Sequence, residues 1–403
     1  MNKLTATELP HAVVMGLSPT GLHVVRELGR HGVPVIGVSS ETQAGSASRY
    51  LSGRVVEPDP ERRLNMLCEM FPVSEFAEKG KKPVLIPTSD QDVDLIIENS
   101  ERLARHFFFQ ESYSDGLASQ IMDKESFYEI CGSQGVAFPT LWKGTVSEIR
   151  GLRDELRFPC IIKPSRIHEI KELMKGKKVW MVRDESELEG ILDSIPDGSV
   201  MLLAQEIVPG PESEIALYCG YFDSGNNAVQ PFTARKLRQY PPGFGSASLV
   251  QSSDEHECRQ ITEKLLSSIG YRGIAASEFK RDPVTGEWKI IEINVRPSLW
   301  FSISSGAAKQ PVLAAYYRLA GLDVALPELP QQNGVRWRYL LKDLWSTWFY
   351  RSNKDFILPP PDINTLGGSK KRISAVFSMD DPKPALAEIN NFVAKGRQRV
   401  RSK

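Results

Sequence analysis

Two glutamates on one predicted β-hairpin have the spacing that most directly suggests chemistry. The segment 277–297 reads SEFKRDPVTGEWKIIEINVRP, and its turn centres near Thr285. Glu278 and Glu292 each lie seven positions from that turn, so an antiparallel hairpin places them opposite each other. Asn294 follows Glu292 by two residues and points to the same face, because side chains alternate along a strand. Two carboxylates and a carboxamide therefore converge on one face.

The apolar neighbours of Glu292, in the stretch Ile290–Ile293, indicate a strand that is buried on at least one side. An unpaired buried carboxylate is costly, and two facing carboxylates repel each other. A divalent cation removes both difficulties. Oxygen ligands of this kind suit Mg²⁺ or Mn²⁺, with nucleotide phosphates and water completing the coordination. The alternative is a solvated hairpin, on which the two glutamates pair with Lys280 and Lys289.

Three further segments have the charge or the backbone geometry that a nucleotide site requires. Lys124 opens a predicted helix, and Lys163 ends the predicted strand Phe158–Lys163, directly before a proline. The stretch Gln205–Gly210 is a strand that runs into a Pro-Gly break, which frees backbone N–H and C=O groups to read an adenine edge. Each feature alone is weak, since most lysines are solvated and most strands end in turns.

A basic segment, 233–250 (TARKLRQYPPGFGSASLV), carries three cations ahead of a loop rich in glycine and proline. Arg235 or Arg238 could clamp a substrate carboxylate through the two-pronged guanidinium fork. An ordinary basic strand followed by a turn accounts for the same residues, and the sequence leaves both interpretations of Arg238 open.

The elements that must position these residues change character along the chain. The first third alternates buried strands with amphipathic helices, which predicts a doubly wound parallel sheet. Its strands are expected over 11–16, 33–38 and 83–87, with helices over 20–31 and 90–103. The turn at 16–21 could touch an anionic substrate through helix N–H groups.

A second unit starts near Asp123, a predicted helix N-cap. From Glu214 onward the pattern becomes antiparallel, with turns rich in glycine and proline. Strands are expected there over 214–222, 229–237, 249–251, 274–280 and 288–293, a helix over 254–269, and two later helices over 337–350 and 384–395.

Composition restricts the partners and the cellular setting. The 50 basic and 50 acidic residues give no electrostatic case for nucleic acid as a partner. No apolar run approaches the ~18 residues of a membrane span, so no membrane partner is expected. The 5 cysteines are scattered, and no signal peptide precedes the first strand. A reduced, cytoplasmic chain of roughly two to three domains is therefore expected.

Taken in this order, the lysines, the hinge and the carboxylate hairpin resemble the ATP-grasp superfamily over about residues 10–325. The resemblance implies that Lys124 and Lys163 contact the phosphates of ATP. It implies that Glu278, Glu292 and Asn294 bind the magnesium ion. It also implies that the hinge residues Gln205, Glu206, Ile207 and Val208 form the adenine clamp. Either Glu212 or Glu214 would bind the ribose hydroxyls.

Two more residues take roles from the same resemblance. Lys236 would reach the transferred phosphate, and Arg296, in an Asn-x-Arg spacing, would steady a phosphorylated intermediate. One departure concerns the loop that usually folds over the phosphates, which is rich in glycine in this superfamily. The matching stretch 165–178 holds only Gly176, so lysines could supply charge there instead.

The implied architecture is a parallel N-terminal domain followed by an ATP-grasp fold of two α+β subdomains and a small C-terminal appendage. The expected boundaries are 1–120, 121–208, 209–326 and 327–403. The basic segment, together with Asp380–Pro384 (DDPKP), resembles the carboxylate–amine ligase branch that includes D-aspartate ligases.

That branch implies an ATP-dependent ligase that forms an amide bond through an acyl phosphate and releases ADP and phosphate. Its substrates would be a small-molecule carboxylate and an amine, either an amino acid or a peptide, and a homodimer stays open. Two alternatives remain: an ATP-grasp carboxylase that uses bicarbonate, and a non-catalytic nucleotide-binding regulatory protein. The intact set of Glu278, Glu292 and Asn294 argues against the second, because a degenerate relative is free to lose its metal ligands.

Overall fold

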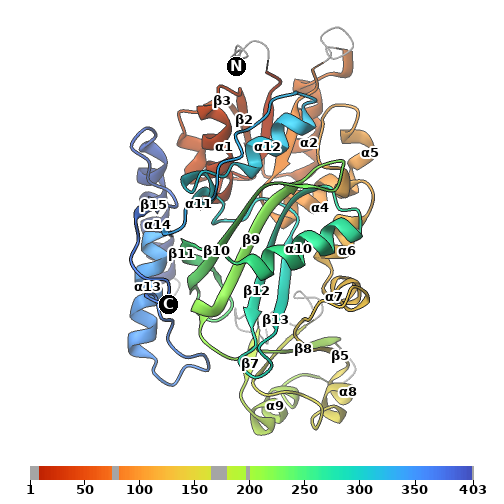
Figure 1. The fold of residues 1–403 in the computed structure, drawn as a ribbon, viewed down its shortest axis with the longest axis vertical. Coiled ribbons are helices and arrows are strands. Elements are labelled where there is room, and N and C mark those ends of the chain that lie inside the picture. The colour runs from red at the N-terminus through yellow and green to blue at the C-terminus, as the bar shows by residue number, and fades with distance from the viewer. Residues whose placement is uncertain (1–8, 75–80, 165–178, 197–199, 402–403) are drawn as a thin grey trace.

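The N-terminal domain is built on a parallel sheet, as the alternation of strands and helices predicts (Figure 1). The computed structural model describes residues 9–74, 81–164, 179–196 and 200–401. The sheet has the strand order β3-β2-β1-β4, and every pairing is parallel. Its strands are β1 (Ala12–Met15), β2 (Val35–Ser39), β3 (Leu51–Val56) and β4 (Val84–Pro87). Its helices are α1 (Pro19–Arg30), α2 (Pro60–Met70), α4 (Asp90–Glu98) and α5 (Ser100–Leu103).

A small antiparallel sheet of order β5-β8-β6-β7 follows. Its strands are β5 (Leu141–Gly144), β6 (Cys160–Pro164), β7 (Trp180–Val182) and β8 (Leu202–Glu206). The neighbouring helices are α6 (Leu117–Met122), α7 (Lys124–Ser133), α8 (Val146–Gly151) and α9 (Glu185–Leu192). The Asp123 carboxylate accepts the backbone N–H of Ser126 at 3.0 Å. The predicted N-cap of α7, which fixes where Lys124 stands, is thereby confirmed.

A seven-stranded sheet of order β13-β12-β9-β10-β11-β14-β15 forms the rest of the scaffold. Its strands are β9 (Ile215–Phe222), β10 (Ala228–Tyr240), β11 (Ser246–Ser252), β12 (Gly273–Arg281), β13 (Trp288–Asn294), β14 (Val335–Arg338) and β15 (Lys371–Ser374). The helices of this part are α10 (His256–Ser268), α11 (Ser302–Gly306), α12 (Pro311–Leu319), α13 (Leu340–Ser352) and α14 (Lys383–Arg401).

The segment predicted as an appendage thus contributes two strands to the edge of the large sheet. The predicted helix over 337–350 begins only at Leu340, because Trp337 belongs to β14 and is fully buried there. Its indole N–H donates to the hydroxyl of Ser302 at 2.6 Å.

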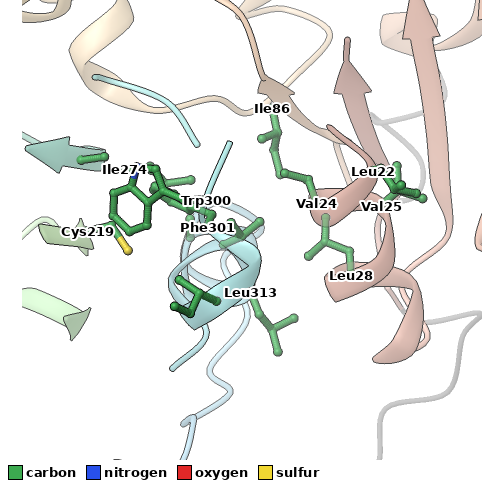
Figure 2. Close-up of a cluster of buried hydrophobic side chains, with 14 of the residues drawn as sticks. Leu22, Val24, Val25, Leu28, Ile86, Cys219, Ile274, Trp300, Phe301 and Leu313 are labelled. Atoms are coloured by element: carbon green, nitrogen blue, oxygen red, sulfur yellow. The ribbon is translucent and has the colours of Figure 1, made fainter. Parts of the chain in front are cut away.

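One apolar core joins the N-terminal domain to the large sheet. Figure 2 shows Val24 and Leu28 of α1 near Leu313 of α12, with Trp300 and Phe301 between these helices and the sheet. All five side chains are buried. This continuous core holds the N-terminal domain against the large sheet, and the loops of both meet at one cavity.

The DDPKP motif closes the chain onto the N-terminal domain. The buried carboxylate of Asp381 accepts the Arg26 guanidinium at 3.0 Å, the Ser48 hydroxyl at 2.7 Å and the Arg49 backbone N–H at 3.0 Å. The neighbouring Asp380 accepts two bonds from Arg30 at the surface. The motif therefore holds the C-terminal segment against the N-terminal domain, a contact that we call the clasp. This structural role accounts for the motif without a catalytic one.

Among the described helices, none combines the length and the apolar character needed to cross a bilayer.

Candidate active site

A cavity of about 780 Å³ is lined by residues from all three sheet regions. It is the place where most predicted site residues meet. Eleven of them line it: Lys124, Lys163, Gln205, Glu206, Ile207, Val208, Glu212, Glu278, Glu292, Asn294 and Arg296. The loop 165–178, expected to lie near the phosphates, falls outside the described residues.

The carboxylate pair has the predicted register, since Glu278 of β12 and Glu292 of β13 are direct Cα partners. A β-bulge follows Glu278 on the same strand. The Asn294 amide donates to Glu292 at 3.2 Å. The Lys236 ammonium donates to Glu278 at 2.5 Å, and the Lys124 ammonium stands 3.9 Å from Glu292. The pair thus faces the cavity between two lysines.

The two carboxyl groups differ in their electrostatic environment. Burial raises the pKa of Glu278, although Lys236 opposes that effect. Burial acts in the same direction on Glu292, but Lys124, Lys236 and the Asn294 amide outweigh it, so the pKa of Glu292 lies below its usual range. The side chain of Glu292 remains 42% exposed to the cavity and that of Glu278 14%. Of the two carboxylates, that of Glu292 is therefore the more accessible to a cation in the cavity.

This donor set fits a hard divalent cation. In the described part of the chain, no three His, Cys, Asp or Glu side chains lie close enough together to hold a metal by themselves. Glu278 and Glu292 supply carboxylate oxygens, and Asn294 supplies a carbonyl oxygen. Phosphate oxygens and water would complete six-fold coordination, the arrangement in which Mg²⁺ is usually bound with a nucleotide.

Lys124 and Lys163, predicted to contact the phosphates of ATP, both line the cavity. Lys124 donates to the carbonyl of Ile291 at 2.6 Å and lies 5.5 Å from the centre of the Tyr128 ring. Burial lowers the pKa of Lys124, against the pull of Glu292. Burial and then the neighbouring Lys124 lower the pKa of Lys163. Two crowded cations of this kind are stabilised by a bound anion such as phosphate.

The hinge residues 205–208 after β8 line the cavity, and the polar side chains of Gln205 and Glu206 are bonded to the scaffold. The carboxylate of Glu206 accepts the Thr140 N–H at 2.9 Å and the Lys289 ammonium at 2.7 Å. The Gln205 amide donates to the Tyr128 hydroxyl at 2.9 Å. With these side chains fixed, the backbone of residues 206–208 is held at the cavity wall, as an adenine clamp requires. The clamp itself stays a prediction.

The two candidate ribose acids have different surroundings. Glu212 is buried and accepts the backbone N–H groups of Gln239 at 2.9 Å and Gly243 at 2.6 Å, so it braces the loop after β10. Burial raises its pKa. Glu214 is not among the cavity-lining residues and lies 3.4 Å from Arg235. Glu212 has the better position, and the assignment stays a prediction.

The other four basic residues of predicted function lie in three places. Arg296 lines the cavity and donates to Asp90 at 2.7 Å. Lys236 reaches the cavity wall through Glu278. Arg235 makes a two-pronged pair with Glu255, at 3.0 and 2.6 Å, and does not line the cavity. Arg238 does not line the cavity, and its guanidinium donates to Asp343 at 2.7 Å. β-Bulges on both sides of Arg238 break the alternation of side chains along the strand and turn this side chain away from the cavity.

Sequence reasoning missed several cavity residues. Lys280 was considered only as a partner for the glutamates, yet it lines the cavity and donates to the Gly210 carbonyl at 2.7 Å. Burial lowers its pKa to about 8. Residues 88–91, which include the start of α4, also line the cavity and were not predicted there. Residues 18–20 line it too, and they lie in the turn 16–21 for which a contact with an anionic substrate was predicted. Gly16 in that turn has φ +84°, and an added Cβ would lie 2.5 Å from the Thr88 hydroxyl oxygen.

Comparison with known proteins identifies a relative in sequence. A D-aspartate ligase from Enterococcus faecium (strain Aus0004) is 27% identical over 232 residues. That alignment covers 55% of this chain and 55% of the relative, so the match spans about half of each. No protein-family model matches the sequence.

Solved structures support the fold over more of the chain. An N5-carboxyaminoimidazole ribonucleotide synthetase in complex with ADP superposes with a TM-score of 0.59 at 13% identity, covering 78% of each chain. The biotin carboxylase domain of Hydrogenobacter thermophilus 2-oxoglutarate carboxylase, solved with MgADP and bicarbonate, gives 0.59 at 15% identity, covering 81% of this chain and 73% of that one. The chain thus has the ATP-grasp fold and is similar in sequence to a D-aspartate ligase over about half of its length.

Proposed function

We propose that this protein is an ATP-dependent carboxylate–amine ligase that forms an amide bond through an acyl phosphate. The observation that carries the proposal is the facing pair Glu278–Glu292, set between Lys236 and Lys124 on the wall of a cavity that spans all three sheets. The similarity to a D-aspartate ligase supports the same reaction class.

The charge arrangement suits transfer of the terminal phosphate of ATP. Lys124 and Lys163 would hold the phosphates, while the hinge at 206–208 would hold the adenine. Magnesium, bound by Glu278, Glu292 and Asn294, would neutralise charge on the transferring group. The catalytic contribution would then come from position and electrostatics, as is usual for phosphoryl transfer.

The carboxylate substrate would approach from the N-terminal side of the cavity. Arg296 supplies a guanidinium there, and Ser18, the N-cap of α1, makes no capping bond with its side chain. The first N–H groups of a helix attract an anion. The substrate oxygen would attack the terminal phosphorus and displace ADP. The amine would then attack the acyl carbon and release phosphate.

A carboxylating reaction is the second candidate, because the structural relatives include a biotin carboxylase domain solved with bicarbonate. In that case the carboxylate would be bicarbonate. The two reactions differ in what they require, since a carboxylase forms no product without bicarbonate.

The test is to incubate the purified protein with Mg-ATP and pools of amino acids, and to measure phosphate release and new masses. The proposal expects an amide product and ADP in buffer purged of carbon dioxide. Dependence of turnover on added bicarbonate would favour the carboxylase, and no ATP turnover with any pool would contradict both.

A further inference from the structure

A second cavity, of about 1060 Å³, lies beside α13 and the edge strands and shares no lining residue with the first. We call it the arginine cavity. Four arginines and one lysine from the sheet line it: Arg238, Arg336, Arg338, Arg372 and Lys371. Asp343 of α13 is the single acidic residue in its described lining.

The strand register places the four arginines on one face of the sheet. Arg336 and Arg372 are Cα partners on the parallel strands β14 and β15, so their side chains emerge side by side. Arg338 follows two residues after Arg336 and shares its face. Leu249 of β11 is the partner of both Arg338 and Arg238, which extends the same row across the sheet.

Only two of these five cations pair with a carboxylate of the described chain, and they share the same one. Asp343 takes the guanidinium of Arg238 at 2.7 Å and that of Arg338 at 2.5 Å. No carboxylate of the described residues lies within 4.0 Å of a side-chain nitrogen of Arg336, Arg372 or Lys371.

The partners of these three cations are neutral. Arg336 donates to the Gln251 side chain at 2.8 Å and to two loop carbonyls, at 3.1 and 3.2 Å. Arg372 donates to the Ser369 hydroxyl at 3.4 Å, and Lys371 to the Gly306 carbonyl at 2.9 Å.

Positive charges this close together repel each other, and a bound anion would relieve that repulsion. Burial lowers the pKa of Arg336, and Arg372 lowers it further. Arginine nevertheless stays protonated in proteins, so the positive charge persists. Several guanidinium N–H groups on Arg336 and Arg372 have no acceptor among the described residues, and they can donate to a ligand. Nη1 of Arg336 and both Nη groups of Arg372 are the donors left over in the described chain, and charge-assisted bonds from two adjacent guanidinium groups suit the oxygens of a phosphate.

The rim of the cavity adds an apolar component. Leu340, Phe377 and Met379 line it and are 51%, 55% and 89% exposed. We propose that the arginine cavity binds a ligand with a phosphate or diphosphate group attached to an organic part that covers this rim. A soluble organic phosphate and a phospholipid headgroup share this chemistry. The proposal does not depend on the reaction assigned to the first cavity.

The experiment measures two probes against a charge-matched pair of variants. Inorganic pyrophosphate is titrated by calorimetry, and vesicles of phosphatidylglycerol or phosphatidylcholine are tested by co-sedimentation. The test variant is Arg336→Gln/Arg372→Gln. The control, Arg62→Gln/Arg105→Gln, removes two exposed arginines from the N-terminal domain. Arg372→Gln alone, at an exposed position, serves if the double variant does not fold.

The proposal expects that pyrophosphate binding weakens at least about tenfold in the test variant and not in the control. Binding to phosphatidylglycerol vesicles that is lost in the test variant alone identifies a lipid headgroup. Pyrophosphate binding without vesicle binding identifies a soluble phosphate. Equal binding by the test and control variants, or no binding of either probe to the native protein, would overturn the proposal.

Discussion

Replacing the two facing glutamates one at a time should separate catalysis from stability. Both Glu278→Gln and Glu292→Gln should lower ATP-dependent turnover by ~10³-fold or more, because each removes a charged ligand of the proposed magnesium site. Their effects on folding should differ, since the two carboxylates have different partners. Only Glu278 is joined by a direct hydrogen bond to a buried lysine, Lys236, whose side chain is 2% exposed.

The expected changes in the free energy of unfolding follow from how deeply each carboxylate and its partner are buried. Breaking a buried ion pair costs about 3–5 kcal/mol when it strands a charge. The glutamine carbonyl can still accept from Lys236, so about 2 kcal/mol is expected for Glu278→Gln. Glu292 stands 3.9 Å from Lys124, with its side chain 42% exposed, and it repels Glu278. Its replacement should therefore change the free energy of unfolding by less than about 1 kcal/mol.

The assay is urea unfolding without magnesium, followed by circular dichroism, beside steady-state phosphate release on the same preparations. Lys143→Ala, in the small sheet and outside the cavity lining, serves as the control for handling and folding. Near-native turnover in either glutamine variant would refute the metal assignment. Equal destabilisation by both would refute the electrostatic asymmetry.

Three further predictions concern other parts of the molecule. Lys163→Ala should weaken binding of a non-hydrolysable ATP analogue by about 10- to 100-fold in calorimetry, while Lys143→Ala leaves it unchanged. Asp381→Asn should destabilise the fold by about 3 kcal/mol in urea unfolding, because three donors lose a buried carboxylate. The exposed Asp380→Asn should cost under about 1 kcal/mol, so equal losses would contradict the clasp. Burial lowers the pKa of Lys280 to about 8. Between that pH and about 10.4, the unfolded chain binds more protons at Lys280 than the folded chain does. The free energy of unfolding should therefore increase as pH rises through this interval. The stability advantage of Lys280→Met over the native protein should then shrink across this interval, and a constant difference would contradict the assignment.

The carboxylate hairpin was predictable because a tight turn fixes its own register. The turn pairs Lys280 with Lys289 and Phe279 with Ile290, which brings the two glutamates close together on neighbouring strands; a β-bulge next to Glu278, which the local pattern does not reveal, then places Glu292 rather than Ile291 directly opposite it. The helix start at Lys124 was predictable for the same reason, since Asp123 caps it locally. Strand–helix alternation likewise predicted that the strands of the first sheet run parallel, although not their order.

The other features of the fold and the site depend on contacts between distant segments, which a local sequence pattern does not reveal. Residues 18–20 and 88–91 meet because β1 and β4 are neighbours in the sheet, which requires the strand order. The side chain of Arg238 leaves the cavity because bulges interrupt β10, and the strand shows no irregularity in its sequence. The short edge strands β14 and β15, VRWR and KRIS, carry too few apolar residues to be recognised.

The most direct test of the proposed function is which phosphate bond of ATP breaks. Once a carboxylate substrate is found, chromatography of the nucleotides with the amine omitted and hydroxylamine present measures this. The arrangement of Glu278, Glu292, Asn294 and Lys236 at one end of the cavity, with Lys124 and Lys163 beside it, predicts ADP, phosphate and a hydroxamate of the substrate. Stoichiometric AMP and pyrophosphate would contradict the acyl-phosphate route and the phosphate assignments built on it.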